Sequence, residues 1–161
     1  MSSRLLYFLG FVIICFLLAT GFYLQYVDGI MPCPLCMLQR FCFAGLGILF
    51  FIGFFVHAKP LARYTIDALS VLVSLLGILL AGRQIWLQHF STAENSECGV
   101  SLQYMVQALP LHEVMQKIIA GSAECTQRGW EFLYLDMAEW SLIWFIFFLL
   151  LSLYLLLKKV K

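Results

Sequence analysis

The chain has 161 residues, of which 63% are hydrophobic and only 12% are charged, and its formal net charge is +1. Soluble domains average about 45–50% apolar and about 25% charged residues, and so short a chain cannot hide this apolar excess in a water-soluble core. The composition excludes an ordinary soluble domain, and the small net charge provides no bulk field that would attract nucleic acid. We therefore expect an all-α membrane protein in which residues 1–161 form a single membrane domain.

Four apolar segments are long enough to cross a bilayer as helices, which predicts a four-helix transmembrane bundle. The segments cover approximately residues 5–27, 37–56, 64–87 and 140–157. The first has 23 residues between Arg4 and Asp28 without a charged side chain, and this length reaches roughly 34 Å against a hydrocarbon core of about 30 Å. A signal peptide is the alternative for this segment, but its apolar stretch is too long and no small-residue cleavage site precedes Asp28.

The placement of charge predicts which connections lie on the same side of the membrane. Six of the ten lysines and arginines flank the spans at the two termini and in the connection 57–63: Arg4, Lys59, Arg63, Lys158, Lys159 and Lys161. The long connection 88–139 holds only two basic residues against seven acidic ones. Because basic residues mark the cytoplasmic side, we expect both termini in the cytoplasm and the connections 28–36 and 88–139 outside.

The long connection contains a pattern of its own. Between Leu102 and Ile119, apolar residues recur at helical spacing, with an interruption at Pro110. The pattern predicts a short amphipathic helix. This helix either packs over the bundle or lies in the membrane interface, and the sequence leaves both options open.

The topology divides the six cysteines. Cys15 and Cys42 lie within spans, where a small apolar filler is the simplest interpretation. The other four lie in the outward connections: Cys33, Cys36, Cys98 and Cys125. An even number of cysteines in an oxidising compartment suggests disulfides. Of the possible pairings, Cys33–Cys36 with Cys98–Cys125 is the most natural, because a two-residue gap already brings two sulfurs together.

The Cys33–Cys36 pair has the features of a reactive site. A bridge across so small a loop removes little entropy from the unfolded chain, so such pairs are more often catalytic or metal-binding than structural. Pro34 suits the first turn of the second helix, which would place Cys36 in that turn. The positive end of the helix dipole favours a thiolate there, and Arg40 follows four residues later on the same helical face.

Other interpretations of these cysteines remain open. Inert disulfides would staple the outer loops of a structural or assembly protein. A zinc site, to which His89 and His112 would contribute, is less favoured because the second cysteine pair is not a CxxC and an oxidising exterior does not suit a thiolate site. Met37, in place of histidine after the CxxC, argues against covalent haem attachment.

Three motifs together resemble a known family. PCPLCMLQR (Pro32 to Arg40), GRQIWLQH (Gly82 to His89) and ECTQRGWEFLYLDMAEW (Glu124 to Trp140), in this order and with four spans, resemble the DsbB-type membrane thiol oxidases. These proteins reoxidise the periplasmic disulfide donor DsbA and pass the electrons to quinone. The resemblance covers essentially the whole chain. It implies the inner membrane of a bacterium, a partner of DsbA type, ubiquinone or menaquinone as cofactor, and a monomer.

The resemblance also implies roles by position. The catalytic residues would be Cys33, Cys36, Cys98 and Cys125. The first pair would face the quinone, and the second would shuttle electrons from the partner, with Cys98 forming the mixed disulfide and Cys125 exchanging with Cys33. Arg40 would bind the quinone, and Arg83 and His89 are weaker candidates for the same site. Snorkelling is the alternative for Arg83, and a solvated loop histidine for His89.

Two related enzymes remain alternatives. Paralogues of the family serve a different, dedicated thioredoxin-fold partner. A vitamin-K-type quinone reductase runs related chemistry on four helices, but the position of Cys98 and Cys125 after the third span favours the DsbB arrangement.

Overall fold

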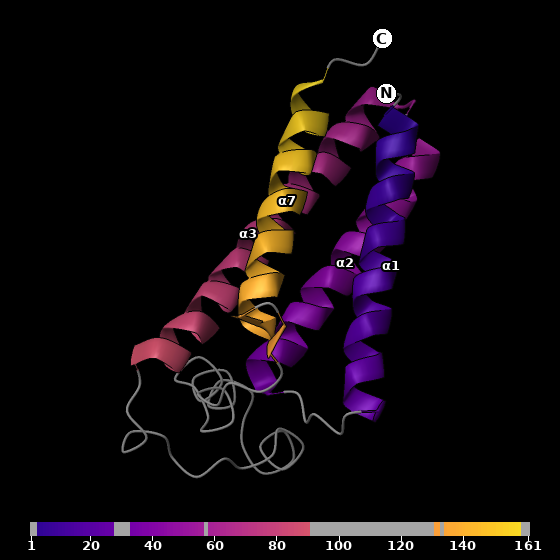
Figure 1. Ribbon diagram of the computed structural model, residues 1–161. Helices are drawn as coiled ribbons and strands as arrows, with labels where there is room; N and C mark the ends of the chain where they lie inside the picture. The colour runs from indigo at the N-terminus through magenta and orange to yellow at the C-terminus, as the bar shows by residue number, and fades with distance from the viewer. Residues whose placement is uncertain (1–2, 28–32, 57, 91–130, 133, 159–161) are drawn as a thin grey trace, which may run out of the picture.

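The computed structural model describes residues 3–27, 33–56, 58–90, 131–132 and 134–158. Within these ranges the chain forms four long helices: α1 (Ser3–Val27), α2 (Pro34–Val56), α3 (Pro60–Phe90) and α7 (Met137–Leu157). Each is long and apolar enough to cross a membrane, so the predicted four-helix fold is confirmed. The helices run along one another, and α1 begins and α7 ends at the same end of the bundle (Figure 1). We call this the terminal end and the opposite one the cysteine end.

Helices that follow one another in the described chain make the most extensive contacts with each other. α1 contacts α2, α2 contacts α3, and α3 contacts α7. The outward surface remains apolar, since Phe16 and Phe41 are each 71% exposed and Leu79 is 70% exposed. Such a surface suits lipid rather than water as the solvent. The chain is therefore a multi-pass membrane protein.

The second and third predicted spans, 37–56 and 64–87, are shorter than the helices that the structure shows. α2 begins at Pro34 and α3 at Pro60, so the connections 28–36 and 57–63 are shorter than expected. Proline stabilises the first turn of a helix because its φ angle is already helical and its missing N–H has no partner there. α3 also extends to Phe90, which shortens the start of the connection 88–139.

The start of α7 is fixed by a capping box. Asp136 Oδ1 accepts a hydrogen bond from the backbone N–H of Glu139 at 2.9 Å, and Glu139 Oε2 accepts from the N–H of Asp136 at 3.0 Å. Two short antiparallel strands, β1 (Glu131–Phe132) and β2 (Leu135–Asp136), lead into it. The helix therefore begins at Met137 rather than at 140, and the hairpin was not predicted.

Aromatic rings fill the centre of the bundle. Phe43 of α2 stacks on Phe145 of α7 with ring centroids 4.1 Å apart, and Phe50 meets Phe148 edge to face at 5.8 Å. The ring of Phe145 occupies the place where a Cβ at Gly77 would lie. Small residues of this kind let membrane helices approach closely.

A buried polar network joins three helices at the terminal end. The Tyr7 hydroxyl donates to Asp67 Oδ1 at 2.6 Å, and Arg63 Nε lies 3.5 Å from Asp67 Oδ2. Arg63 Nη2 also donates to the carbonyls of Leu155 at 2.6 Å and Lys158 at 2.7 Å, where α7 ends. The carbonyls at the C-terminal end of a helix are the ones that need partners from outside the helix. Arg63, expected in a surface connection, is therefore a buried residue of α3 that is 4% exposed.

Candidate active site

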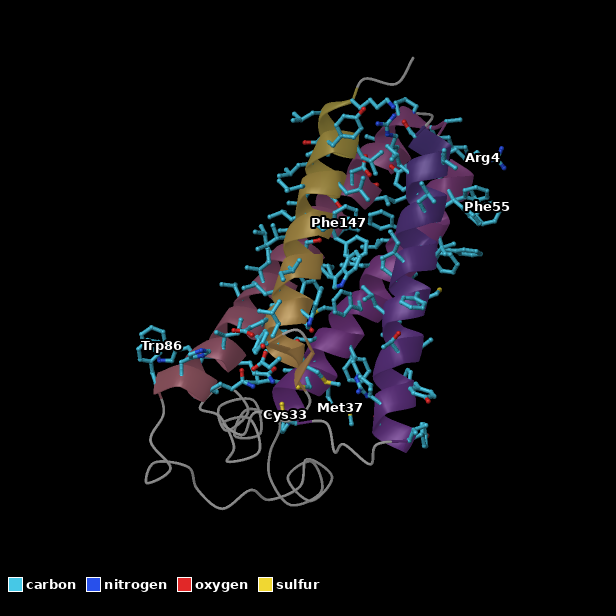
Figure 2. All side chains as sticks on the ribbon, in the orientation of Figure 1. Arg4, Cys33, Met37, Phe55, Trp86 and Phe147 are labelled. Carbon is cyan, nitrogen blue, oxygen red and sulfur yellow. The ribbon has the colours of Figure 1, made fainter. Side chains whose placement is uncertain are left out.

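The cysteine end of the bundle brings the start of α2 beside the last turns of α3. Cys33 and Met37 lie at this end of α2, and Trp86 lies on α3 at the same end (Figure 2). Cys33 is the residue before α2: its carbonyl accepts the backbone N–H of Met37 at 3.1 Å. Pro34 is thus the first helical residue, and Cys36 lies in the first turn, as the sequence predicted.

The two sulfurs of the CxxC pair are in contact. Cys33 Sγ and Cys36 Sγ are 3.0 Å apart, and an S–S bond of about 2.05 Å needs only a short further approach. The Cys33 sulfur also accepts the backbone N–H of Cys36 at 3.4 Å. It therefore occupies the position of a helix-capping acceptor, where the helix dipole favours negative charge. Cys33 is 5% exposed and packs against Leu35 and Leu87.

Two carboxamides complete the surroundings of Cys36. Gln84 of α3 donates from Nε2 to Cys36 Sγ at 3.1 Å, and its Oε1 lies 3.5 Å from the same sulfur. Gln39 of α2 donates from Nε2 to Gln84 Oε1 at 2.8 Å. Both glutamines are 3% exposed. Neither glutamine was expected in the site from its sequence position, although an uncharged polar side chain near the end of an apolar span was a usable signal.

The guanidinium of Arg40 reaches towards α1. It donates to Gln25 Oε1 at 2.5 Å and to the carbonyl of Gly21 at 2.9 Å, and it lies 5.3 Å from the ring centre of Phe22. Gly21 lies next to this guanidinium: a Cβ at that position would be 3.6 Å from Arg40 Nε, in ordinary van der Waals contact. Arg40 is thus held between α1 and α2, near the cysteine end.

The weaker candidates lie on the last turns of α3. Arg83 is half-buried and directly precedes Gln84. His89 is exposed, and its Nδ1 lies 3.0 Å from the carbonyl of Ile85 one turn earlier. The helix extends past both residues, so His89 is a helical residue rather than a loop residue.

The remaining predicted residues divide into two groups. Cys42 is buried in the core and Cys15 is exposed on α1. Cys98, Cys125, His112 and the helix expected over 102–119 lie outside the described residues. In the described ranges, no cluster of three or more His, Cys, Asp or Glu side chains that could hold a metal ion is found.

The fold and the site place this protein in the class of membrane thiol–disulfide oxidoreductases. It is a membrane bundle with a CxxC pair at the start of a helix, and each of the two sulfurs accepts a hydrogen bond. Comparison with known proteins supports this class. The family model described as disulfide bond formation protein DsbB matches residues 3–155. The chain belongs to the DsbB family, and it is a thiol oxidoreductase of disulfide bond formation.

Curated relatives match over nearly their full length, and each of the following is named disulfide bond formation protein B. The protein from Marinobacter nauticus is 35% identical over 99% of this chain and 95% of its own length. The protein from Hahella chejuensis is 38% identical over 92% and 90%, respectively. The protein from Stutzerimonas stutzeri is 34% identical over 98% and 97%.

Proposed function

We propose that this protein is a quinone-dependent thiol oxidase of the bacterial inner membrane that reoxidises a periplasmic partner of DsbA type. Residues 1–161 form one membrane domain, with both termini in the cytoplasm and the cysteine end facing the periplasm. The contact of 3.0 Å between Cys33 Sγ and Cys36 Sγ carries the proposal. The orientation is supported by the basic residues of the terminal end and of the connection beside it: Arg4, Lys59, Arg63 and Lys158.

The proposed relay transfers two electrons and two protons from the partner to quinone. The partner dithiol exchanges with a Cys98–Cys125 bridge, through a mixed disulfide at Cys98, and leaves as a disulfide. Cys125 then exchanges with Cys33, so the second bridge re-forms while the Cys33–Cys36 pair becomes a dithiol. Membership of the family supports these two roles, and both residues of the second pair lie outside the described ranges.

The residues of the cysteine end fit a quinone in their chemistry. Quinone carbonyls accept hydrogen bonds, and the Arg40 guanidinium carries more N–H donors than its contacts with Gln25 and Gly21 use. The ring of Phe22 beside it provides an apolar face. Arg40 would hold the quinone, with Arg83 and His89 as further candidates. Bound quinone, as ubiquinone or menaquinone, would take up the two electrons and two protons of the dithiol and become quinol.

Turnover by the purified protein tests the proposal. Wild-type protein in detergent is mixed with a reduced thioredoxin-fold partner of DsbA type and a soluble ubiquinone or menaquinone analogue, and quinone absorbance is followed. We expect Cys36→Ser to reduce the rate to background, while Cys15→Ser, on the outward surface of α1, retains it. Full activity of Cys36→Ser would overturn the relay, and an inactive wild-type protein would overturn the assigned function.

A further inference from the structure

Two buried carboxamides link α2 and α3 next to the reactive pair. Gln39 and Gln84 are each 3% exposed, at the end of spans where an unpaired amide is costly. They satisfy each other through the 2.8 Å bond from Gln39 Nε2 to Gln84 Oε1. The other end of the Gln84 amide faces Cys36 Sγ, at 3.1 Å from Nε2. The contacts that run from Gln39 through Gln84 therefore end on Cys36 Sγ, a sulfur that takes part in the proposed relay.

We propose that Gln84 is a catalytic residue that stabilises the thiolate of Cys36, and that Gln39 is a positioning residue that fixes the direction of the Gln84 amide. This inference rests on the proposed function and extends it to two residues of the same site. Gln39 donates to the oxygen of Gln84, so the nitrogen of Gln84 is the atom turned towards the sulfur. A thiolate accepts hydrogen bonds only, and the N–H donor matches it.

The geometry favours the charged form of Cys36 over the neutral one. The donor contact from Gln84 Nε2 measures 3.1 Å, whereas the contact through which a neutral thiol would donate to Gln84 Oε1 measures 3.5 Å. Hydrogen bonds to a charged group are also stronger than those between neutral groups, especially where water is excluded. The neighbouring sulfur receives its own donor, the backbone N–H of Cys36 at 3.4 Å. Cys36 Sγ thus accepts from Gln84 Nε2, whereas Cys33 Sγ accepts from a backbone N–H.

This arrangement has a consequence for the redox equilibrium of the pair. When the reduced pair is oxidised from the form with a Cys36 thiolate, the S–H bond of Cys33 breaks and one S–S bond forms. Two electrons leave to the quinone of the proposed function; of the two protons that balance them, one comes from Cys33 and the other was released when Cys36 became a thiolate. The Gln84 donor contact is strongest with a thiolate, so it stabilises the reduced form more than the disulfide. Stabilising the reduced form makes the disulfide a stronger oxidant, which suits a pair that must in turn oxidise Cys98 and Cys125.

Substitution of Gln84 tests the inference in the full-length protein. We expect Gln84→Leu, which keeps most of the volume but removes the donor, to lower the rate of Cys36 alkylation at neutral pH about tenfold. The profile of that rate against pH should move to higher pH. The reduction potential of the pair should become more negative, by about 30 mV for a tenfold change in the equilibrium constant. Alkylation at Cys36 is measured by peptide mass spectrometry on the reduced protein with iodoacetamide.

The controls separate the donor from general damage. Gln88→Leu makes the same chemical change one turn further along α3, at a half-buried position, and we expect it to leave Cys36 reactivity unchanged. Gln84→Glu keeps the shape of the side chain but replaces the donor with an acceptor, so it guards against a Gln84→Leu protein that fails to fold. Gln39→Leu, which frees the Gln84 amide to rotate, should give a smaller loss of about threefold in the same direction.

Failure of the inference about Gln84 can be told apart from failure of the proposed function. If the wild-type protein fails to reduce the quinone analogue, the proposed function is wrong whatever Gln84 does. If the wild-type protein is active, and folded Gln84→Leu or Gln84→Glu protein alkylates Cys36 with the wild-type pH profile, only the inference about Gln84 is overturned. An equal loss in Gln88→Leu would also overturn it, because the effect would then not depend on contact with Cys36.

Discussion

Arg63 should hold the terminal end of the bundle together, and its removal should be among the most damaging single changes in the described chain. The side chain is 4% exposed and joins Asp67 of α3 to the carbonyls of Leu155 and Lys158 at the end of α7. Interhelical hydrogen bonds in membrane proteins contribute only about 0.6 kcal/mol on average. Two such bonds therefore account for about 1 kcal/mol of the free energy of unfolding.

The larger contribution comes from the charge that Arg63 would leave behind. Asp67 is 1% exposed, and without the guanidinium its carboxylate keeps only the hydroxyl of Tyr7 as a described partner. Removing one partner of a buried ion pair costs about 3–5 kcal/mol, mostly because the remaining charge is unpaired. We therefore expect Arg63→Leu to destabilise the folded protein by about 3–5 kcal/mol. Asp67→Leu should do similar damage, because it leaves the guanidinium without its carboxylate.

The double variant distinguishes an unpaired charge from lost packing. If the unpaired carboxylate dominates, Arg63→Leu with Asp67→Leu should be less damaging than the sum of the two single changes, since neither charge is then left alone. Unfolding in detergent micelles, by titration with a denaturing detergent, measures the differences. Lys59→Leu, an exposed cation just before α3, is the matched control and should change stability by less than about 0.5 kcal/mol. A loss below about 1 kcal/mol in Arg63→Leu, or additive losses in the double variant, would refute this reasoning.

Two further predictions concern the site and the core. Arg40→Ala should raise the apparent KM for a quinone analogue, because it removes the donors proposed to hold the quinone; an unchanged KM in steady-state turnover would remove Arg40 from that site. Gly77→Ala should destabilise the fold by about 1–3 kcal/mol, since its Cβ would meet the ring of Phe145. Gly82→Ala on the same helix has open space around its Cβ and should be neutral. Equal stability of the two glycine variants in the same unfolding titration would contradict the packing argument.

The sequence predicted the spans because membrane helices are specified by a local property. A long apolar run identifies a spanning helix without knowledge of its neighbours. The errors lie at the ends of the spans, and three of them were avoidable. Pro34 was recognised as a residue of the first turn, and Pro60 has the same property. Asp136 and Glu139 also have the spacing of a capping box. The turn at Tyr134, with a φ of 66°, carries no such signal, because few residues other than glycine, asparagine and aspartate are expected there.

Contacts between helices were harder to predict, because they depend on the rotation of each helix about its axis. Gln84 is 48 residues from Cys36 in the chain, and Arg63 is 92 residues from Leu155. Sequence spacing within α2 correctly placed Cys36 in the first turn. It also placed Arg40 on the same helical face, four residues later. It gave no means of knowing that α3 would present an amide to the sulfur, or that the guanidinium of Arg40 would be held by α1.

At the cysteine end, the reactive sulfur and the nearby cation of α2 are each contacted by a different neighbouring helix. Cys36 and Arg40 lie one turn apart on α2, yet their described polar partners lie on different helices, Gln84 on α3 and Gln25 on α1. The sulfur is therefore stabilised by a neutral donor that carries no net charge into the bundle, while the cation stays at the α1 side, beside the ring of Phe22. A neutral donor stabilises a thiolate without forming a buried ion pair, whose desolvation can exceed its attraction. On this argument the charge of Arg40 remains available for a quinone carbonyl, and loss of Gln84 and loss of Arg40 should affect different steps of turnover.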